Sequence, residues 1–404
     1  MSIQASTVAP FRQAPDPAEV LARIATVVPD LAARAQQVES ERRVPAEHIE
    51  ALGRAGLYDL LKPKEFSGYE FDFAVLAEAI QTLGAACAST AWVCGLYGAH
   101  QWLLAQFPLQ AQRDVWEGAD GPICGSYAPV CKALPDGRGY RISGRWSFAS
   151  GCDGARWAFC AALIDGPDGG APRPAFMLVP ASDCRIDDDW FTVGLAGTGS
   201  KTLVLENVYV PEHRVLPFAL VMNGQSPGSK HHSNPTYAVP MFVYFPACLA
   251  SAGLGAAQGA LDAYTKEVGD RATRGAVVGG AARMADFPTI QIRVTEASAA
   301  IDAAHEILMR DLHRRTASAR AGEPIGIAER VESRRGQAFA VKLAVQAVEA
   351  LNASTGGQGL ALSNPVQRAW RDVNATARHI SFNWDAVGTM YGAMALGGEP
   401  KGMF

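Results

Sequence analysis

The sequence lacks the features of several classes of protein. None of its eight cysteines forms a C-x-x-C pair, so a zinc ribbon or a thioredoxin-like site is not supported. The formal net charge is −4, from 36 basic and 40 acidic residues, and no long basic run is present. This balance argues against a nucleic acid or an anionic membrane surface as a partner.

Export and membrane signals are also missing. Residues 1–17 are polar and lack the charged-then-apolar layout of a signal peptide. No stretch approaches the roughly 18 to 20 uninterrupted apolar residues that span a bilayer. We therefore expect a cytoplasmic protein whose cysteines are mostly buried as small hydrophobic side chains.

Two glycine-rich segments fall short of nucleotide-binding motifs. In residues 194–202 (GLAGTGSKT), Ser200 separates the last glycine from Lys201, and strand-like runs surround the segment. We interpret it as a tight turn between strands. Residues 253–259 (GLGAAQG) have the wrong spacing for a dinucleotide fingerprint and no preceding strand, which favours a helix that packs closely through small residues. No NAD(P)H-binding domain is visible, so electrons for a redox reaction must arrive by another route.

The composition changes twice along the chain, and 49% of its residues are hydrophobic, enough for a large core. We expect a mainly α-helical protein with a central β domain: residues 1–118 helical, 119–215 a β-barrel or sheet, and 216–404 a helical bundle. Helical segments, β segments and helical segments follow one another, which argues against a doubly wound sheet.

The spacing of apolar residues predicts where the main helices and strands lie. Apolar residues at helical spacing predict a helix that includes residues 20–35, and residues 74–83 and 89–107 also favour helices. Short β-rich runs between turn residues predict strands at 139–142, 157–164, 175–179 and 202–205. A second long helix is predicted for residues 336–353, and a packing stripe typical of a bundle helix comprises Ile290, Val294, Ala297, Ile301, Ala304 and Leu308.

Histidines supply candidate chemistry. His100 lies in an apolar run, where a hydrogen-bonded core histidine is the simple interpretation, and His379 lies in a charged helix that resembles an ion-paired surface. His231 and His232 are adjacent and therefore point in different directions, so we expect no metal site. The extended segment 144–153 (GRWSFASGCD) alternates aromatic and hydroxyl residues, which suits contact with a planar heterocycle.

These segments resemble the acyl-CoA dehydrogenase family over nearly the whole chain. Residues 60–69 (LLKPKEFSGY) are similar to an early turn of that family, 144–151 to its flavin-facing strand, and 356–372 (GGQGLALSNPVQRAWRD) to its C-terminal segment. Many dehydrogenases carry a catalytic glutamate in a Tyr-Glu-Gly soon after the Arg-Asp pair. Here that stretch reads His379-Ile380-Ser381, so the carboxylate is missing.

The closer resemblance is to the flavin-dependent monooxygenase branch, the oxygenase components of two-component systems, which includes 4-hydroxyphenylacetate, secosteroid-phenol and dibenzothiophene oxygenases. Five segments match in order: 91–102, 126–129, 146–153, 193–200 and 368–379. The resemblance implies a reaction of reduced flavin with O2, through a C4a-(hydro)peroxide, that hydroxylates a small aromatic compound such as a phenol, an indole or a polyketide.

The resemblance also implies residue roles. His100, Ser150 and His379 would be catalytic, with Ser150 near flavin N5 and the two histidines beside substrate and oxygen. Gly125 stands where hydroxyphenylacetate-type enzymes carry a serine, which removes one hydroxyl beside the substrate. The implied flavin contacts are Trp92, Ser126, Tyr127, Trp146, Phe148, Ser150 and Arg274.

Cofactor, partner and alternatives follow from the same resemblance. It implies reduced FMN as first choice and FAD as second, a separate NAD(P)H-dependent flavin reductase, and a homotetramer. A thioester-oxidising flavin dehydrogenase or oxidase, an N- or S-oxygenating member of the same fold, and a helical scaffold without catalysis are the alternatives. The sequence does not identify the substrate.

Overall fold

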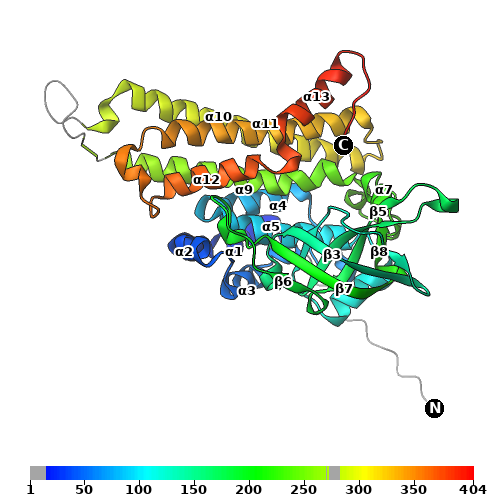
Figure 1. Ribbon diagram of the computed structural model, residues 1–404. Helices are drawn as coiled ribbons and strands as arrows, with labels where there is room; N and C mark the ends of the chain where they lie inside the picture. Colours follow the sequence, from blue (N-terminus) through cyan, green and yellow to red (C-terminus); the bar gives the residue numbers. More distant parts are fainter. Residues whose placement is uncertain (1–14, 270, 273–282) are drawn as a thin grey trace.

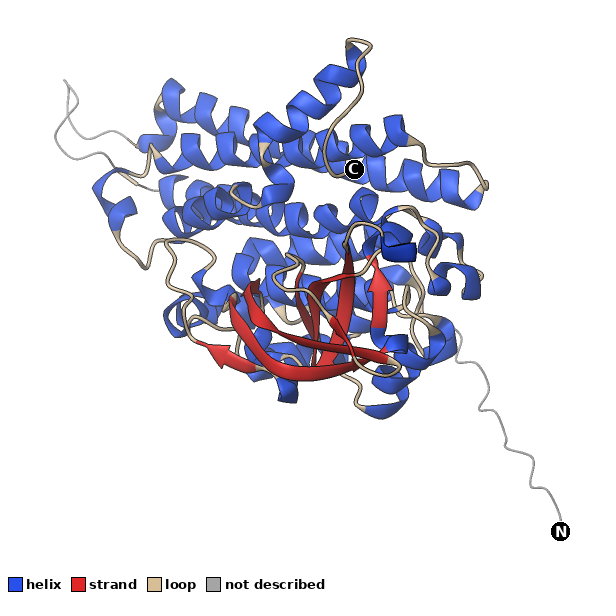
Figure 2. Cartoon of the chain, turned by 45° about the vertical axis from the view of Figure 1, so that its right-hand side comes forward, coloured by secondary structure: helices blue, strands red, loops and turns tan. Residues whose placement is uncertain are grey.

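The computed structural model describes residues 15–404 except 270 and 273–282. Helices, then strands, then long helices follow along the chain, and in both views the long C-terminal helices lie on one side of the molecule and the strands on the other (Figure 1, Figure 2). The expected mainly helical fold with a central β part and a C-terminal bundle is confirmed. The division at residues 118/119 and 215/216 stays a prediction.

The N-terminal part is a cluster of helices around one buried helix. The single helix expected around residues 20–35 is two helices, because Pro29 lacks the N–H that a continuing helix needs and instead occupies the first turn of the second one. Asp16 accepts the N–H of Ala18 and so caps the first helix. The helices are α1 (Pro17–Ala25), α2 (Val28–Glu41), α3 (Ala46–Ala55), α4 (Phe73–Ala86), α5 (Ala88–Leu104) and α6 (Leu109–Arg113).

Two four-stranded sheets form the β part. The first has the order β1-β4-β5-β8, in which only the β1–β4 pair is parallel, and the second has the order β2-β3-β7-β6. The four predicted strands lie in β3, β4, β5 and β7, and the shorter strands escaped the sequence pattern. The strands are β1 (Ile123–Ser126), β2 (Leu134–Pro135), β3 (Gly139–Ala149), β4 (Trp157–Ile164), β5 (Arg173–Pro180), β6 (Arg185–Asp187), β7 (Lys201–Pro211) and β8 (Val215–Pro217).

The C-terminal part is built on four helices that pack together, α9 to α12, and α13 packs against α11 (Figure 1). The predicted stripe on α10 is buried except for Val294, which is half-buried. The second long helix begins earlier than expected, at Ile327, because Pro324 and Gly326 are the real breaks. The helices are α7 (Phe218–Met222), α8 (Pro227–His231), α9 (Met241–Gly269), α10 (Pro288–Arg320), α11 (Ile327–Asn352), α12 (Pro365–Ala377) and α13 (Trp384–Ala395).

Helix α9 corrects the statement that no apolar run is long enough to span a bilayer. Among the described residues it is the one helix that passes a length and hydropathy test for a membrane span, but 89% of the apolar window is buried inside the fold. Its apolar character is therefore that of a core helix.

The predicted small-residue packing of residues 253–259 is confirmed as a close seam between α9 and α4. A Cβ at Gly255 would lie 2.2 Å from the carbonyl oxygen of Gln81, and one at Gly259 would lie 2.1 Å from that of Ala85. Only glycine permits this approach, because any side chain there would overlap the backbone of α4.

Candidate active site

His100 and Tyr127 form a hydrogen-bonded pair at the buried end of α5. The ring Nε2 of His100 lies 2.6 Å from the Tyr127 hydroxyl, and the ring Nδ1 lies against the Ile123 carbonyl. A carbonyl only accepts, so Nδ1 carries the proton, and the Tyr127 hydroxyl donates to Nε2. Burial lowers the pKa of His100 to about 4, which keeps the imidazole neutral at working pH.

Aromatic rings surround this pair. His100 stacks on Phe245 with ring centroids 5.7 Å apart and meets Phe159 edge-on at 5.4 Å. Tyr127 meets Phe176 edge-on at 5.2 Å. The pair is thus a small polar group in an apolar, aromatic wall, where a hydrogen bond is little weakened by water.

Gly125 makes room for the Tyr127 ring. A Cβ at position 125 would lie 2.9 Å from Tyr127 Cε1 and 3.5 Å from His100 Cε1. The missing side chain therefore does more than remove a hydroxyl, because it lets Tyr127 reach His100. The hydroxyl of Tyr127 bonds to His100, and the flavin contact expected of this residue stays a prediction.

Ser150 lies directly after β3, beyond an irregularity that turns the strand. The pairing of β3 with β7 shifts register between Trp146 and Ala149, and Phe148 has φ of 65°, which leaves its ring 71% exposed. The indole Nε1 of Trp92 donates to Ser150 Oγ over 3.1 Å. This hydrogen bond to the Ser150 hydroxyl joins the end of β3 to helix α5.

His379 reaches the same place from the end of α12. Its ring lies edge-on to Trp92, with centroids 5.8 Å apart. Its Nδ1 accepts the backbone N–H of Ser381 at 3.2 Å, so in the neutral ring the proton is on Nε2. Burial, helped by the charge of Arg334, lowers the pKa of His379 to about 4.

The three predicted catalytic residues therefore fall into two groups along α5. Trp92 bridges Ser150 and His379, and His100 lies eight residues further along the helix, about 12 Å at the usual rise per residue. Helix α5 therefore joins Trp92, Ser150 and His379 at one end to the His100–Tyr127 pair at the other.

A buried turn that the sequence analysis passed over completes the Ser150 end. The turn between β6 and β7, interpreted as a plain glycine turn, contains Ser200, whose Oγ lies 2.7 Å from both Ser150 Oγ and Thr198 Oγ1. Asp372 of α12 accepts the Leu195 N–H at 2.7 Å, and burial raises the pKa of this carboxyl to about 6. The sequence signal for this feature was the presence of Thr198 and Ser200, two hydroxyl residues, among the glycines of the turn.

Of three further expected flavin contacts, the structure describes two. Trp146 is fully buried and donates from one sheet to the Ala161 carbonyl of the other at 2.7 Å, so no face of its ring is open to a cofactor. Alternation along β3 turns position 146 inward, and the flavin contact expected of Trp146 stays a prediction. Ser126 is buried and donates to the Ser147 carbonyl at 2.7 Å, which ties β1 to β3. Arg274 lies outside the described residues.

The remaining residues fit a reduced flavin. An isoalloxazine ring needs aromatic surface along its plane and a polar partner at N5. Phe148 offers an exposed ring beside Trp190, with centroids 5.9 Å apart, and Ser150 Oγ is a buried polar atom at the strand end. Trp92, Phe148 and Ser150 would hold the flavin there, and bound flavin would supply the electrons that activate oxygen.

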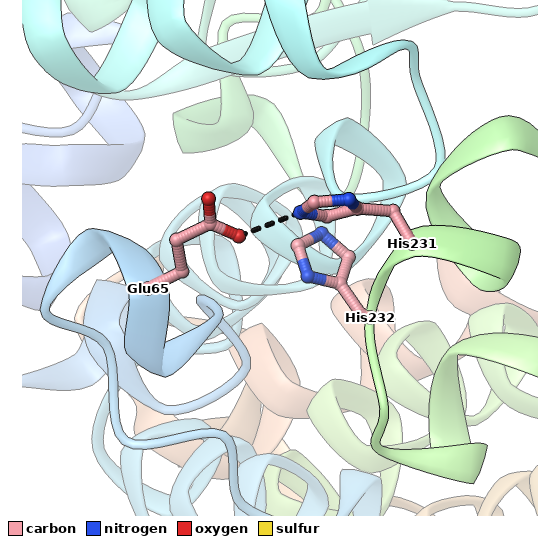
Figure 3. Close-up of side chains that lie close together, drawn as sticks. All are labelled: Glu65, His231 and His232. Carbon is pink, nitrogen blue, oxygen red and sulfur yellow. Dashed lines mark hydrogen bonds and ion pairs between the residues drawn. The ribbon is translucent and has the colours of Figure 1, made fainter.

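A separate polar cluster joins η2 (Lys64–Phe66) to α8. Glu65 lies 2.7 Å from His231 Nε2, although the sequence indicated no carboxylate near the two histidines (Figure 3). The potential ligand atoms of Glu65, His231 and His232 all lie within 4.8 Å of one another. His232 Nε2 donates to Gln112 Oε1 at 2.9 Å, and burial lowers the pKa of this histidine to about 4. Both Nε2 atoms have protein partners in this structure, and the expectation that these histidines hold no metal stays a prediction.

Comparisons with known proteins identify the family. Profiles described as acyl-CoA dehydrogenase N-terminal domain and C-terminal domain match residues 22–117 and 247–384. The FADH(2)-dependent resorcinol hydroxylase oxygenase component of Rhizobium sp. (strain MTP-10005) is 54% identical over 97% of this chain and 98% of that protein. The crystal structure of 3-HSA hydroxylase from Rhodococcus sp. RHA1 has a TM-score of 0.89 and 37% identity, over 95% of this chain and 98% of that one. The Streptomyces XiaF structure with FADH2 and glycerol has a TM-score of 0.85 and 29% identity, over 95% and 96% of the two chains.

Fold and site together define a flavoenzyme of the acyl-CoA dehydrogenase type that has lost the dehydrogenase glutamate. The chain belongs to the acyl-CoA dehydrogenase family. Within that family it is an oxygenase component of the two-component flavin-dependent monooxygenases, and it depends on reduced flavin. This outcome favours oxygen transfer over the thioester-oxidising alternative.

Proposed function

We propose that the chain hydroxylates a small phenol and that resorcinol is the first substrate to test. The observation that carries this proposal is the 2.6 Å contact between Tyr127 and His100 inside a wall of phenylalanine rings. A phenol ring needs apolar surface for its faces and one polar partner for its hydroxyl, and this arrangement offers both. The 54% identical relative, named as a resorcinol hydroxylase, supports the choice.

The reaction balances with reduced flavin and O2. One oxygen atom is inserted into a ring C–H bond of the phenol to form a hydroxyl group, and the other leaves as water with the two hydrogens of the reduced flavin. The two electrons come from the reduced flavin, which is left oxidised. With resorcinol the product is a trihydroxybenzene.

Tyr127 and His100 orient the phenol. The Tyr127 hydroxyl donates to His100 Nε2 and keeps its oxygen lone pairs free to accept the substrate hydroxyl. Burial raises the pKa of Tyr127 well above its usual range and lowers that of His100, so both stay neutral. This pair positions the ring through hydrogen bonds without placing a charge beside it.

His379 acts at the flavin end. Its Nδ1 is occupied by the Ser381 N–H, so Nε2–H is the group available to donate toward oxygen. The edge-on contact with Trp92 fixes the plane of the imidazole ring. Trp92, which is buried, excludes water from the same corner.

For the cofactor, we propose reduced FAD ahead of reduced FMN. The name of the 54% identical relative specifies FADH(2), and the XiaF structure contains FADH2. This reverses the order that the sequence resemblance implied. Anaerobic titration with both reduced flavins tests it, and tighter binding of reduced FMN would overturn it.

The partner, assembly and compartment follow as proposals. A separate NAD(P)H-dependent reductase supplies the flavin, since relatives are named as oxygenase components. We propose a homotetramer assembled through the C-terminal bundle, as the family resemblance implies. All eight cysteines are free thiols, which fits a reducing cytoplasm.

The test mixes the purified protein with chemically reduced FAD, O2 and resorcinol, and measures product per reduced flavin. We expect hydroxylated product with the wild type and much less with His100→Ala. Product that is unchanged in both His100→Ala and Tyr127→Phe would overturn the proposed substrate site. Bleaching of bound flavin by an acyl-CoA, with no product from any phenol, would overturn the function itself.

A further inference from the structure

A chain of hydroxyl groups leads away from Ser150 into the protein. Ser150 Oγ lies 2.7 Å from Ser200 Oγ, and Ser200 Oγ lies 2.7 Å from Thr198 Oγ1. Thr198 Oγ1 lies 2.8 Å from the carbonyl oxygen of Leu195, where the chain ends. All three hydroxyl residues are buried, with at most 7% of their surface exposed, so water does not compete for these contacts.

The carbonyl at the end fixes the direction of every bond. A carbonyl oxygen has no proton, so Thr198 must donate to Leu195, because two bare oxygens 2.8 Å apart would repel each other. Thr198 then accepts from Ser200, and Ser200 accepts from Ser150. Three contacts use three hydroxyl protons, and each proton points away from the site.

The far end of the chain is firmly held. Leu195 has the left-handed φ of 52°, and its N–H donates to Asp372 at 2.7 Å. The indole of Trp190 also donates to the Leu195 carbonyl at 3.1 Å. These contacts keep the carbonyl pointing at Thr198, so the direction of the chain does not reverse.

Ser150 is consequently left as an acceptor. Its proton is committed to Ser200, and one of its lone pairs accepts the indole N–H of Trp92 at 3.1 Å. What remains toward the site is one lone pair. A group that carries a hydrogen is complementary to this lone pair, and a bare nitrogen is repelled by it.

We propose that Thr198 and Ser200 are positioning residues that make Ser150 select flavin with a hydrogen on N5. Reduced flavin carries that hydrogen, and oxidised flavin presents a bare N5 lone pair. The chain thus favours binding of the incoming reduced cofactor and release of the oxidised one. The inference rests on the proposed placement of flavin N5 at Ser150.

The test compares the dissociation constants of oxidised and reduced FAD, without substrate or turnover. Oxidised FAD is titrated by flavin fluorescence, and reduced FAD anaerobically by ultrafiltration. In Ser200→Ala the Ser150 proton loses its acceptor and can turn to a bare N5. In Thr198→Val the Ser200 proton can turn back toward Ser150, with the same effect. We expect the preference for reduced FAD to fall about tenfold in both variants, mostly through tighter binding of oxidised FAD.

Control variants distinguish failure of the directed hydroxyl chain from failure of the proposed flavin placement. Thr316→Val removes a buried hydroxyl that bonds Tyr244 in the bundle, and it should leave the ratio unchanged. If Ser150→Ala removes the preference while Ser200→Ala and Thr198→Val keep it at the wild-type value, the directed chain is wrong and the flavin site stands. If Ser150→Ala changes neither affinity, the placement of N5 at Ser150 is wrong. Thermal unfolding of each variant shows that the fold is kept.

Discussion

Tyr127 donates its hydroxyl to His100 Nε2 across 2.6 Å, and the space that permits this contact is the missing side chain of Gly125. In the proposed substrate site, the histidine would act on the substrate through the tyrosine. Two residues that the family resemblance assigned to different tasks, one to flavin and one to substrate, act as a unit.

The first prediction concerns Tyr127→Phe. The change removes one hydrogen bond to His100 and the acceptor for the substrate hydroxyl, so we expect product per reduced flavin to fall about five- to tenfold. Hydrogen peroxide should rise by one mole for each mole of product lost, because oxygen that is not transferred is released as peroxide. Tyr209→Phe, on a half-exposed ring in β7, is the control and should leave coupling intact. Wild-type coupling in Tyr127→Phe would show that the tyrosine does not serve the substrate.

Gly125→Ala provides a second prediction. The new methyl group would lie 2.9 Å from Tyr127 Cε1 and 3.3 Å from Phe159 Cβ, so the Tyr127 ring must move. We expect KM for the phenol to rise about tenfold with the fold retained. Gly392→Ala in α13, where nothing lies within 4 Å of the added methyl, should leave KM unchanged. An equal rise in both variants would argue against a special role for Gly125.

A third prediction concerns stability in acid. His100 has a folded pKa of about 4 against an ordinary value of 6.5, so between these values the unfolded chain binds a proton that the folded chain does not. The free energy of unfolding therefore falls as the pH drops from 6.5 toward 4. Between pH 7 and pH 5 this one group contributes a loss of about 2 kcal/mol. Urea unfolding at both pH values should show a smaller loss in His100→Gln than in the wild type.

The surface histidine His313 provides the comparison for that experiment. His313→Gln should lose as much stability between the two pH values as the wild type does. A loss in His100→Gln equal to that of the wild type would mean that His100 is not held neutral by burial.

The fourth prediction concerns Asp372, whose buried carboxylate holds the Leu195 N–H at 2.7 Å. Asp372→Ala leaves that N–H without an acceptor and should cost about 1–3 kcal/mol of stability at pH 7. Asp372→Asn keeps an acceptor and should cost less. Because burial raises the pKa of the carboxyl to about 6, the wild type should gain stability over the Asn variant as the pH falls from 6 toward 4. Thermal unfolding across that range checks the sign.

The sequence predicted those parts of the fold that depend on local pattern. The apolar stripe of α10 and the small residues of 253–259 report which faces are buried, and both interpretations hold in the structure. Short strands such as β1 and β8 were missed because three or four residues carry too little periodicity. The position of Pro29 was visible in the sequence but was overridden by the apolar spacing around it.

The site was predicted less completely, for a physical reason. The resemblance indicated Ser150, His100 and His379, whose side chains the structure places in two linked groups. Residue type along β3 did not show which way each side chain points, so Trp146 was assigned to the flavin although it faces the core. Contacts between segments far apart in sequence, such as Ser150 with Ser200 or Leu195 with Asp372, exist only after folding.

The close glycine contact between α4 and α9 limits how far the helices around His100 can move relative to each other. With backbone against backbone at Gly255 and Gly259, the two helices have no side chains that can repack to let them slide or separate. Helix α5, which carries His100, packs on both of them, and Phe245 of α9 stacks on that histidine. The two helices that hold His100 and Phe245 therefore keep a fixed position relative to each other. The residues that follow Tyr127, 128–130, are exposed and lack this constraint, so adjustment of the proposed site to substrates of different size is expected there.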